Sequence, residues 1–343
     1  MQESTPMLDL LNQTLQSKGL GASATGWLGI DFGSTAIKVV RLRKRRQHLE
    51  CLQDTWIETP TLDEHCSLPL RSVDDSFPPA GVVTSNRWIE IEFEPRHSPV
   101  ATGETPENLD CQWSSGIAYL VADSEYRQAI QDKRLQVAPG LTQWIGHQLL
   151  QAGIEPRVID CPPWTLARAL TLIHDKKTSE ASAILDWSAT TPMLVIQRNG
   201  LPQFTRLLEI GGLLQMTESI SARLSLNFAE TIHYLKRIDK PQQPANAQKR
   251  QNDWTSALLA PQIRQLAEEI TRSLHFLKWQ CPGLLPTELY LCGGGATLPI
   301  VVEQLQSQLD IELRIWNLPT IDGQTLGPAS AQAAALSAME WLS

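Results

Sequence analysis

Two short segments of this sequence place an aspartate at the end of an apolar run and follow it with small or hydroxylated residues. The first is Gly29-Ile30-Asp31-Phe32-Gly33-Ser34-Thr35, and the second begins Asp186-Trp187-Ser188. A buried strand that delivers a carboxylate to such a turn lets backbone N–H groups approach an anion closely. We therefore predict that both turns contact phosphate. We also predict that Asp31 and Asp186 hold Mg²⁺ through water, because Mg²⁺ keeps much of its hydration shell.

The first turn supplies the better set of candidate phosphate contacts. Besides Asp31 they are Gly33, Ser34 and Thr35. Lys38 lies across a predicted hairpin, where its ammonium either faces a phosphate or is a solvated strand lysine. An Asp-x-Gly-Ser sequence also occurs in ordinary β-turns, so the turn alone does not decide between binding and structure.

The second turn is weaker by its own residues. Asp186 again leads it, but Ser188 stands where a glycine would allow the closest approach of backbone to a ligand. We keep Ser188 as a candidate contact. Gly211 and Gly212, which precede a predicted helix, are further candidates.

A third candidate segment is the triple-glycine turn, Gly293-Gly294-Gly295, which follows a predicted strand and opens a predicted helix. Without side chains, this backbone can lie against a nucleoside or phosphate. A purely structural turn between strand and helix is the alternative. The sequence contains neither a G-x-G-x-x-G fingerprint nor a G-x-x-x-x-G-K-[ST] loop, so other nucleotide-binding classes are not indicated.

The elements that must position these residues repeat along the chain. Residues 27–57 predict a strand, a tight turn and two further strands, and a similar pattern begins at Ala183. In the second copy Asn199-Gly200 predicts a hairpin, and a helix is expected after Gly212 and up to about Leu224. Two three-stranded units, each led by an aspartate near the end of its first strand, predict a duplicated fold.

The remaining chain divides into helical, extended and polar segments. Residues 58–115 are rich in proline and acidic residues, with a strand candidate only at 88–93, and residues 239–253 predict a mobile loop. A short amphipathic helix at 7–18 packs on its own domain or binds a partner or a second copy. The other expected elements are helices at 258–279, 298–309 and 329–341 and strands at 288–292 and 312–316.

Composition limits the class of protein. At 343 residues we expect about two domains, and the net charge of −8 argues against general nucleic-acid binding. The six cysteines include no Cys-x-x-Cys pair, and no apolar run reaches 18 residues, so we expect a cytosolic protein in a reducing compartment. The basic residues within 41–46 predict a solvated hairpin tip, with a patch facing anionic lipid as the alternative.

The order of these motifs resembles the actin-like ATPase superfamily, and most closely the PilM family of type IV pilus assembly proteins. The matching segments are 28–40, 158–169, 203–212 and 291–299. The resemblance implies an α/β actin-like ATPase fold of two ribonuclease-H-like domains with a reduced or divergent extra subdomain. It divides the chain into an N-terminal amphipathic segment at 1–25, a first domain at 26–175 with a divergent insert at about 58–115, and a second domain at 176–343.

The resemblance also implies a role. It assigns Asp31, Gly33, Ser34, Thr35 and Lys38 to the first phosphate motif, Asp186 to the second, and the triple-glycine turn to an adenosine motif. Lys236 lies in a Tyr-Leu-Lys-Arg sequence similar to the family helix that borders the nucleoside.

Family members bind ATP, with Mg²⁺, and capture the N-terminal cytoplasmic tail of a bitopic inner-membrane partner, PilN. For this chain the resemblance implies the same partner, other pilus platform components, no nucleic acid, possible self-association, and a cytoplasmic place at the inner membrane through partners.

This sequence departs from the family pattern at Ser188 and His233, which replace the usual glycine and glutamate, and in the region around 60–115. These departures leave catalysis open, with weak ATPase activity as one outcome. Two alternatives follow: a nucleotide-free interaction protein similar to the cytoplasmic domain of the type II secretion component GspL, and a small-molecule kinase of the same fold.

Overall fold

The chain forms two units, each built around one sheet. The computed structural model describes residues 27–33, 35–45, 48–58, 80–84, 91–92, 118–120, 136–137, 156–160, 162–174, 180–208, 210–238, 245–321 and 323–339. Unit 1 comprises 1–105, 123–173 and 317–343, and unit 2 comprises 106–122 and 174–316. The division at 173/174 lies close to the expected boundary at 175/176. The C-terminal 317–343, which sequence placed in the second domain, belongs to unit 1.

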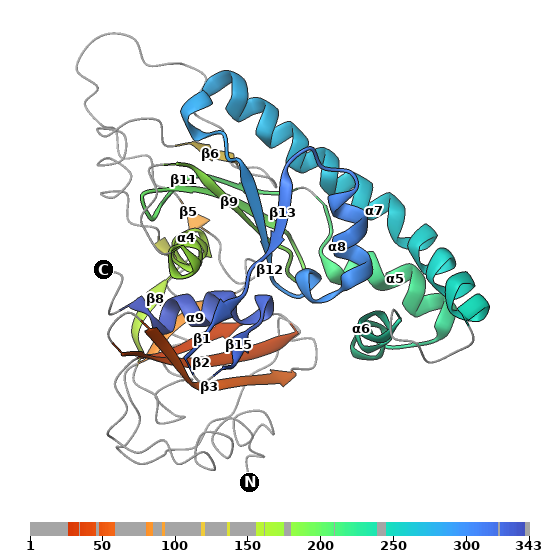
Figure 1. Cartoon of the computed structure of the whole chain (residues 1–343), viewed down its shortest axis with the longest axis horizontal. Helices are drawn as coiled ribbons and strands as arrows, with labels where there is room; N and C mark the ends of the chain where they lie inside the picture. The colour runs from red at the N-terminus through yellow and green to blue at the C-terminus, as the bar shows by residue number, and fades with distance from the viewer. Residues whose placement is uncertain are drawn as a thin grey trace. The chain divides into compact units, whose positions relative to one another are not determined.

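The sheet of unit 1 has the strand order β3-β2-β1-β4-β8 (Figure 1). The predicted hairpins are confirmed: β1 (Leu28–Phe32), β2 (Ala36–Arg45) and β3 (His48–Glu58) are antiparallel. β4 (Ala80–Thr84) pairs in parallel with β1, and β8 (Pro156–Asp160) pairs in parallel with β4. Sequence reasoning missed β4, because five residues directly after Pro78 and Pro79 show too little periodicity to separate a strand from a loop.

The C-terminal helix packs directly against β1 and β2 of unit 1. A turn at Pro328–Ser330 leads into α9 (Ala331–Ser337), and α9 also contacts α4 (Pro162–Ile173). A Cβ added to Gly29 would lie 2.7 Å from the backbone nitrogen of Ser337, so only glycine permits this approach. The Ser337 hydroxyl accepts from the Leu42 N–H and donates to the Trp27 carbonyl, both at 2.8 Å.

The sheet of unit 2 has the order β13-β12-β9-β10-β11-β6. The second predicted three-stranded pattern is confirmed by β9 (Ser182–Asp186), β10 (Met193–Arg198) and β11 (Leu201–Leu207). Asn199 and Gly200, with φ of 58° and 78°, form the predicted hairpin turn. β12 (Glu288–Cys292) is the parallel neighbour of β9, β13 (Glu312–Ile315) pairs in parallel with β12, and β6 (Ala118–Leu120) pairs with β11.

The two sheets share one topology. In each, an antiparallel three-stranded meander continues through its first strand into two parallel strands, so β3-β2-β1-β4-β8 corresponds to β11-β10-β9-β12-β13. The first strands, β1 and β9, each carry an aspartate at or next to their last residue. The predicted duplication is therefore confirmed at the level of strand order and direction.

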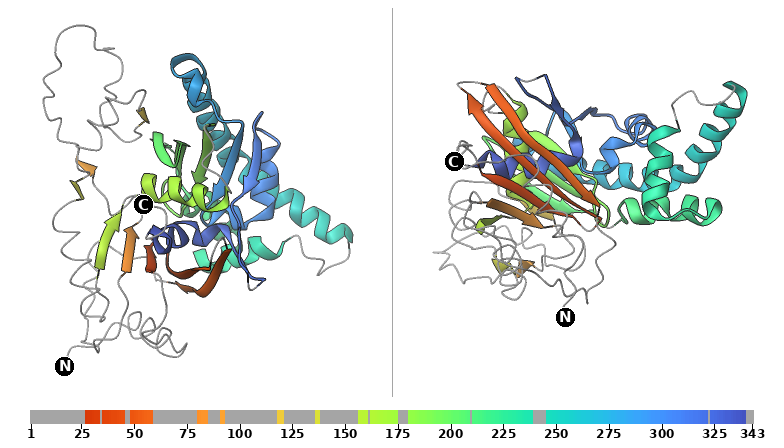
Figure 2. Two further views of the ribbon diagram at one scale, coloured as in Figure 1. Left: turned by 60° about the vertical axis from the view of Figure 1, so that its left-hand side comes forward. Right: turned by 90° about the horizontal axis from the view of Figure 1, so that it is seen from below.

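The described helices of unit 2 follow β11 or β12 in the chain. They are α5 (Leu213–Leu224), α6 (Phe228–Arg237), α7 (Ala245–Gln280) and α8 (Pro299–Gln306), with a short turn at Pro282–Leu284. Figure 2 shows α5, α6 and the first half of α7 gathered as one helical group. The mobile loop predicted at 239–253 is wrong for 245–253, which are helical in α7. Polar residues without apolar periodicity hid this helical segment.

An ion pair links α7 to strand β11. Glu269 of α7 is only 6% exposed, and its Oε2 lies 2.6 Å from the guanidinium of Arg206 in β11. Its Oε1 lies 2.6 Å from the guanidinium of Arg272, on the same helix. Buried Leu259, Ile263, Leu266 and Ile270 carry the predicted apolar face of the same helix.

Two small ribbons complete the described strands: β5 (Ile91–Glu92) with β7 (Gln136–Val137), and β14 (Leu318–Pro319) with β15 (Thr325–Leu326). β5 falls within the strand candidate at 88–93. The predicted helix at 7–18 and most of 58–115 lie outside the described residues.

Arg41 corrects another expectation. It is 2% exposed within β2 and not part of a solvated tip, and burial, with neighbouring Arg43, lowers its pKa.

No helix in the described ranges is long and apolar enough to cross a bilayer.

Candidate functional site

The Asp31 turn of unit 1 is held by a local ion pair. Register pairs Asp31 with Lys38 across the β1–β2 hairpin, and the Lys38 ammonium lies 2.6 Å from Asp31 Oδ2. Asp31 is 3% exposed, so this contact neutralises a carboxylate that burial would otherwise penalise. The two predicted contacts on this hairpin therefore lie together.

The loop between β1 and β2 is tight. Gly33 N–H donates to the Ala36 carbonyl at 2.9 Å, and a Cβ added to Gly33 would lie 2.7 Å from that same oxygen. Glycine is thus required by the turn itself. Thr35 is half-buried in the bend, and Ser34 lies outside the described residues.

The Asp186 turn of unit 2 lies directly beside the triple-glycine turn, because the two strands that lead into them are neighbours. β9 and β12 are parallel, and their last residues, Asp186 and Cys292, are register partners. The Trp187 N–H donates to the Cys292 carbonyl at 3.0 Å, and the Gly295 N–H donates to the Trp187 carbonyl at 3.0 Å. Two segments separated by about a hundred residues in sequence therefore form one compact site.

Each of the three glycines lets a different neighbour approach. Gly293 has φ +81°, and a Cβ there would overlap Asp186 Oδ1 and lie 2.8 Å from the Trp187 carbonyl oxygen. A Cβ on Gly294 would lie 2.7 Å from Leu213 Cδ1, and one on Gly295 would lie 2.7 Å from the Trp187 indole. Packing within unit 2 thus requires glycine at Gly293 and Gly295, independently of any ligand, whereas a Cβ on Gly294 would meet only the flexible end of the Leu213 side chain.

The start of α5 completes this arrangement. Gly212 N–H donates to the Thr190 carbonyl, and Leu213 N–H donates to the Ser188 carbonyl at 3.1 Å. The Ser188 hydroxyl donates to the Thr191 carbonyl at 3.0 Å, which closes the second turn without glycine. Gly211 precedes Gly212 and lies against the Gln215 side chain. The structure thus brings Asp186, Ser188, Gly211, Gly212 and the triple-glycine turn together.

Lys236 lies one helix away from this cluster. It is half-buried on α6, which begins with a capping box of Asn227 and Glu230 and contacts α5 through Thr231 and Ser221. Leu213, the first residue of α5, lies against Gly294. Helix α5 therefore contacts both α6 and the triple-glycine turn. His233, where the family helix has glutamate, is exposed and contacts Arg237 at 3.2 Å.

Sequence reasoning missed two supporting side chains, Trp187 and Cys292. The Trp187 indole is 1% exposed and packs against Gly295, whereas its Nε1 has no hydrogen-bond partner among the described residues. The Cys292 thiol is buried and lies 3.9 Å from Asp186 Oδ1, within reach of a thiol hydrogen bond. The available signal was the pair of strands ending at Asp186 and Cys292, since parallel strands bring their carboxyl ends to one edge.

We tested whether these residues fit a nucleotide and Mg²⁺. The described residues contain no group of three His, Cys, Asp or Glu side chains that could hold a metal ion. A Mg²⁺ carried by phosphate and water needs only one or two carboxylates, so Asp31 beside Lys38 fits such an ion. Asp186 fits less well, because one of its oxygens is packed against Gly293 and the Cys292 thiol.

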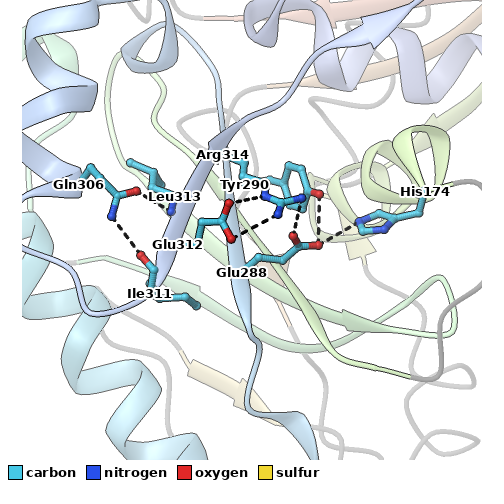
Figure 3. A network of polar contacts seen from close by, with 8 residues as sticks. All are labelled: His174, Glu288, Tyr290, Gln306, Ile311, Glu312, Leu313 and Arg314. Atoms are coloured by element: carbon cyan, nitrogen blue, oxygen red, sulfur yellow. Dashed lines mark hydrogen bonds and ion pairs between the residues drawn. The ribbon is translucent and has the colours of Figure 1, made fainter.

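A separate polar network ties edge strand β13 to β12 (Figure 3). Glu288 Oε2 receives Arg314 at 3.0 Å, and Glu288 Oε1 accepts from the Tyr290 hydroxyl at 3.1 Å and lies 4.0 Å from His174 Nε2. The hydrogen bonds that Arg314 donates to the Glu312 carboxylate raise the pKa of Arg314 and lower the pKa of Glu312. Burial raises the pKa of Tyr290. Sequence reasoning did not single out this network, which lies on different residues from the predicted site.

Comparison with protein families shows to which family the chain belongs. A family model for the type IV pilus assembly protein PilM matches residues 142–331. The chain belongs to the PilM family. The match includes the Asp186 turn, Gly211, Gly212, Lys236 and the triple-glycine turn, while the Asp31 turn lies before it. No curated protein matches this PilM-family chain.

Solved structures agree on the fold. A PilM–PilN type IV pilus biogenesis complex aligns with a TM-score of 0.58 at 19% identity, covering 91% of this PilM-family chain and 98% of that chain. The ethanolamine utilization protein EutJ from Carboxydothermus hydrogenoformans aligns with a TM-score of 0.51 at 13% identity, covering 96% of each chain. The predicted actin-like ATPase fold is confirmed.

Proposed function

We propose that this chain is a nucleotide-binding scaffold of a type IV pilus assembly platform. The observation that carries the assembly role is the family match over residues 142–331. In this proposal the chain captures the N-terminal cytoplasmic tail of a membrane-anchored PilN-like partner. That partner is supported by the similar structure, which is a PilM–PilN complex. The place of action is then the cytoplasmic side of the inner membrane, with other platform components as neighbours and self-association open.

The nucleotide part of the proposal rests on the two turns and the triple glycine. ATP is the proposed ligand, with contacts from Asp31, Gly33, Ser34, Thr35 and Lys38 in unit 1. In unit 2 the proposed contacts are Ser188, Gly211, Gly212, Lys236 and the triple-glycine turn, with Asp186 packed directly beside that turn. Mg²⁺ would neutralise phosphate charge when bound, and Asp31 would hold it through water. Hydrolysis forms no part of this proposal.

A calorimetric titration with ATP and Mg²⁺ tests nucleotide binding. We expect micromolar affinity that Asp31→Ala abolishes, because that variant removes the metal-facing carboxylate and the partner of Lys38. Lys278→Ala is the control, since Lys278 is exposed on α7 and is not one of the proposed ATP contacts. Absence of binding at millimolar ATP would overturn the nucleotide part.

A peptide titration tests partner capture separately. A synthetic peptide of the N-terminal tail of the PilN-like protein from the same organism should bind with micromolar affinity, and ATP should tighten it if nucleotide favours the binding-competent conformation. A scrambled peptide is the control. Equal binding of both peptides would overturn the partner assignment.

One observation favours a second candidate, a nucleotide-free interaction protein similar to the GspL cytoplasmic domain. Gly293 and Gly295 of the triple-glycine turn have a packing reason within unit 2, so their presence does not require a ligand. This candidate predicts peptide binding without ATP binding. The two titrations above separate it from the first.

A further inference from the structure

We infer that Asp186 is a positioning residue that fixes the shape of the triple-glycine turn, and is not a ligand of Mg²⁺. This inference rests on the proposed nucleotide function, in which that turn contacts the nucleotide. It replaces our sequence-based assignment of Asp186 to the metal. The first turn then carries the metal contact through Asp31 alone.

The contacts of the carboxylate support this role. Asp186 is 4% exposed, and its Oδ1 occupies the space that a side chain on Gly293 would need. The same oxygen lies 3.9 Å from the Cys292 thiol, which is buried and can donate to it. One oxygen of Asp186 therefore contacts both the last residue of β12 and the first glycine of the turn.

The backbone of Trp187, directly after Asp186, supports the same turn. The Trp187 N–H and carbonyl bond to Cys292 and Gly295, so residues 186–187 hold both ends of the glycine segment. The Trp187 indole fills the space under Gly295. A three-glycine backbone has large conformational freedom, and these contacts select one conformation before any ligand arrives.

The chemistry of Mg²⁺ opposes the alternative. This ion demands near-ideal octahedral geometry and usually keeps several waters, so a carboxylate that serves it needs an oxygen and space for water beside it. Asp186 and Asp31 are similarly buried, at 4% and 3% exposed, but Oδ1 of Asp186 is packed against Gly293 and the Cys292 thiol. Asp31 differs, because its partner is the mobile end of a long side chain, Lys38, which can move when a cation binds.

The decisive measurement is the ratio of ATP dissociation constants in EDTA and in Mg²⁺ for Asp186→Ala and Asp186→Asn. We expect Asp186→Ala to weaken binding about tenfold, in the range typical of supporting residues, and equally in both buffers. Asp186→Asn keeps an oxygen acceptor for Cys292 and should restore most of the affinity. The EDTA-to-Mg²⁺ ratio stays at the wild-type value in both variants. A ratio that falls toward one in Asp186→Asn would overturn the inference.

Hydrogen exchange of the nucleotide-free protein supplies a readout that does not depend on ATP. The segment 291–298 should exchange about tenfold faster in Asp186→Ala than in wild type, with Asp186→Asn between them. Unchanged exchange in a folded Asp186→Ala would overturn the positioning role. Should Asp186→Ala not fold, the binding ratio and the exchange of Asp186→Asn decide.

The two failures are distinguishable. If the wild-type protein binds no ATP, the proposed nucleotide function fails, and the exchange measurement still tests whether Asp186 holds the turn. If the wild-type protein binds ATP and the ratio falls in Asp186→Asn, only the positioning inference fails.

Discussion

The turns after β1 and β9 start from the same residue type and hold equivalent places in two sheets of one topology, but different contacts support them. Asp31 is paired with Lys38, seven residues away on the same hairpin. Asp186 is packed against Gly293 and Cys292, more than a hundred residues away on a parallel strand. Duplication thus preserved the strand order while the support of the carboxylate became local in one unit and tertiary in the other.

The two aspartates also differ in the residue that each faces on its parallel neighbouring strand. In the parallel neighbours, Asp31 is opposite Val83 of β4, whereas Asp186 is opposite Cys292 of β12. An apolar valine offers no hydrogen bond, so the partner of Asp31 comes from the hairpin. A thiol and an adjacent glycine let the second carboxylate turn toward its parallel neighbour. The predictions below test this difference, from the largest expected effect to the smallest.

Gly293→Ala should have the largest effect on stability. It combines a left-handed backbone conformation with overlap against Asp186 and Trp187, and we expect a loss of about 3 kcal/mol or more in the free energy of unfolding. Urea denaturation measures it. Gly323→Ala is the matched control, because Gly323 has φ +78° with no atom within 4 Å of an added Cβ. It should lose only about 1 kcal/mol. Equal losses would mean that the contacts of the triple-glycine turn contribute nothing.

Lys38→Met should cost about 2 kcal/mol, because it leaves a buried carboxylate without its ammonium partner. Asp31→Asn and the double variant complete a cycle, measured by the same denaturation. The double variant should recover part of the loss, since no buried charge remains. Additive losses would contradict the local ion pair as the support of the first turn.

Gly33→Ala should cost about 1–2 kcal/mol, less than Gly293→Ala, because the added Cβ meets one carbonyl oxygen, that of Ala36, without a left-handed backbone. Thermal unfolding of both variants gives the comparison. Gly327→Ala, which has open space around the added Cβ, should be near wild type. A loss for Gly33→Ala as large as that for Gly293→Ala would remove the distinction between the turns.

The alkylation rates of cysteine thiols should show whether the second turn is closed in the unmutated protein. Burial raises the pKa of the Cys281 thiol, so less reactive thiolate exists at a given pH, and its alkylation by iodoacetamide should reach half-maximal rate above the ordinary thiol pKa. Cys292, buried against Asp186, should remain unmodified until unfolding. Peptide mapping by mass spectrometry measures both. Alkylation of Cys292 as fast as that of Cys281 would show that the turn is open.

Much of the fold could be predicted where the signal was local. Hairpins around Asp31 and after Asp186 follow from short apolar runs and an Asn-Gly turn, and β12 was predicted with its observed bounds. β4 and the first turns of α7 were missed, because one is too short and the other too polar for periodicity to mark them. Arg41 was placed in solvent because its burial depends on neighbours that periodicity does not identify.

The candidate site divides in the same way. The sequence by itself determined which residues could approach phosphate, the duplication, and the place of Lys38 across the hairpin, because hairpin register follows from local spacing, whereas the ion pair of Lys38 with Asp31 was not predicted. Only the tertiary structure decided that Asp186, Cys292 and the triple glycine share one cluster and that Trp187 fills it. Pairing of parallel strands joins distant segments through a crossover, and no local pattern encodes which strand ends will meet.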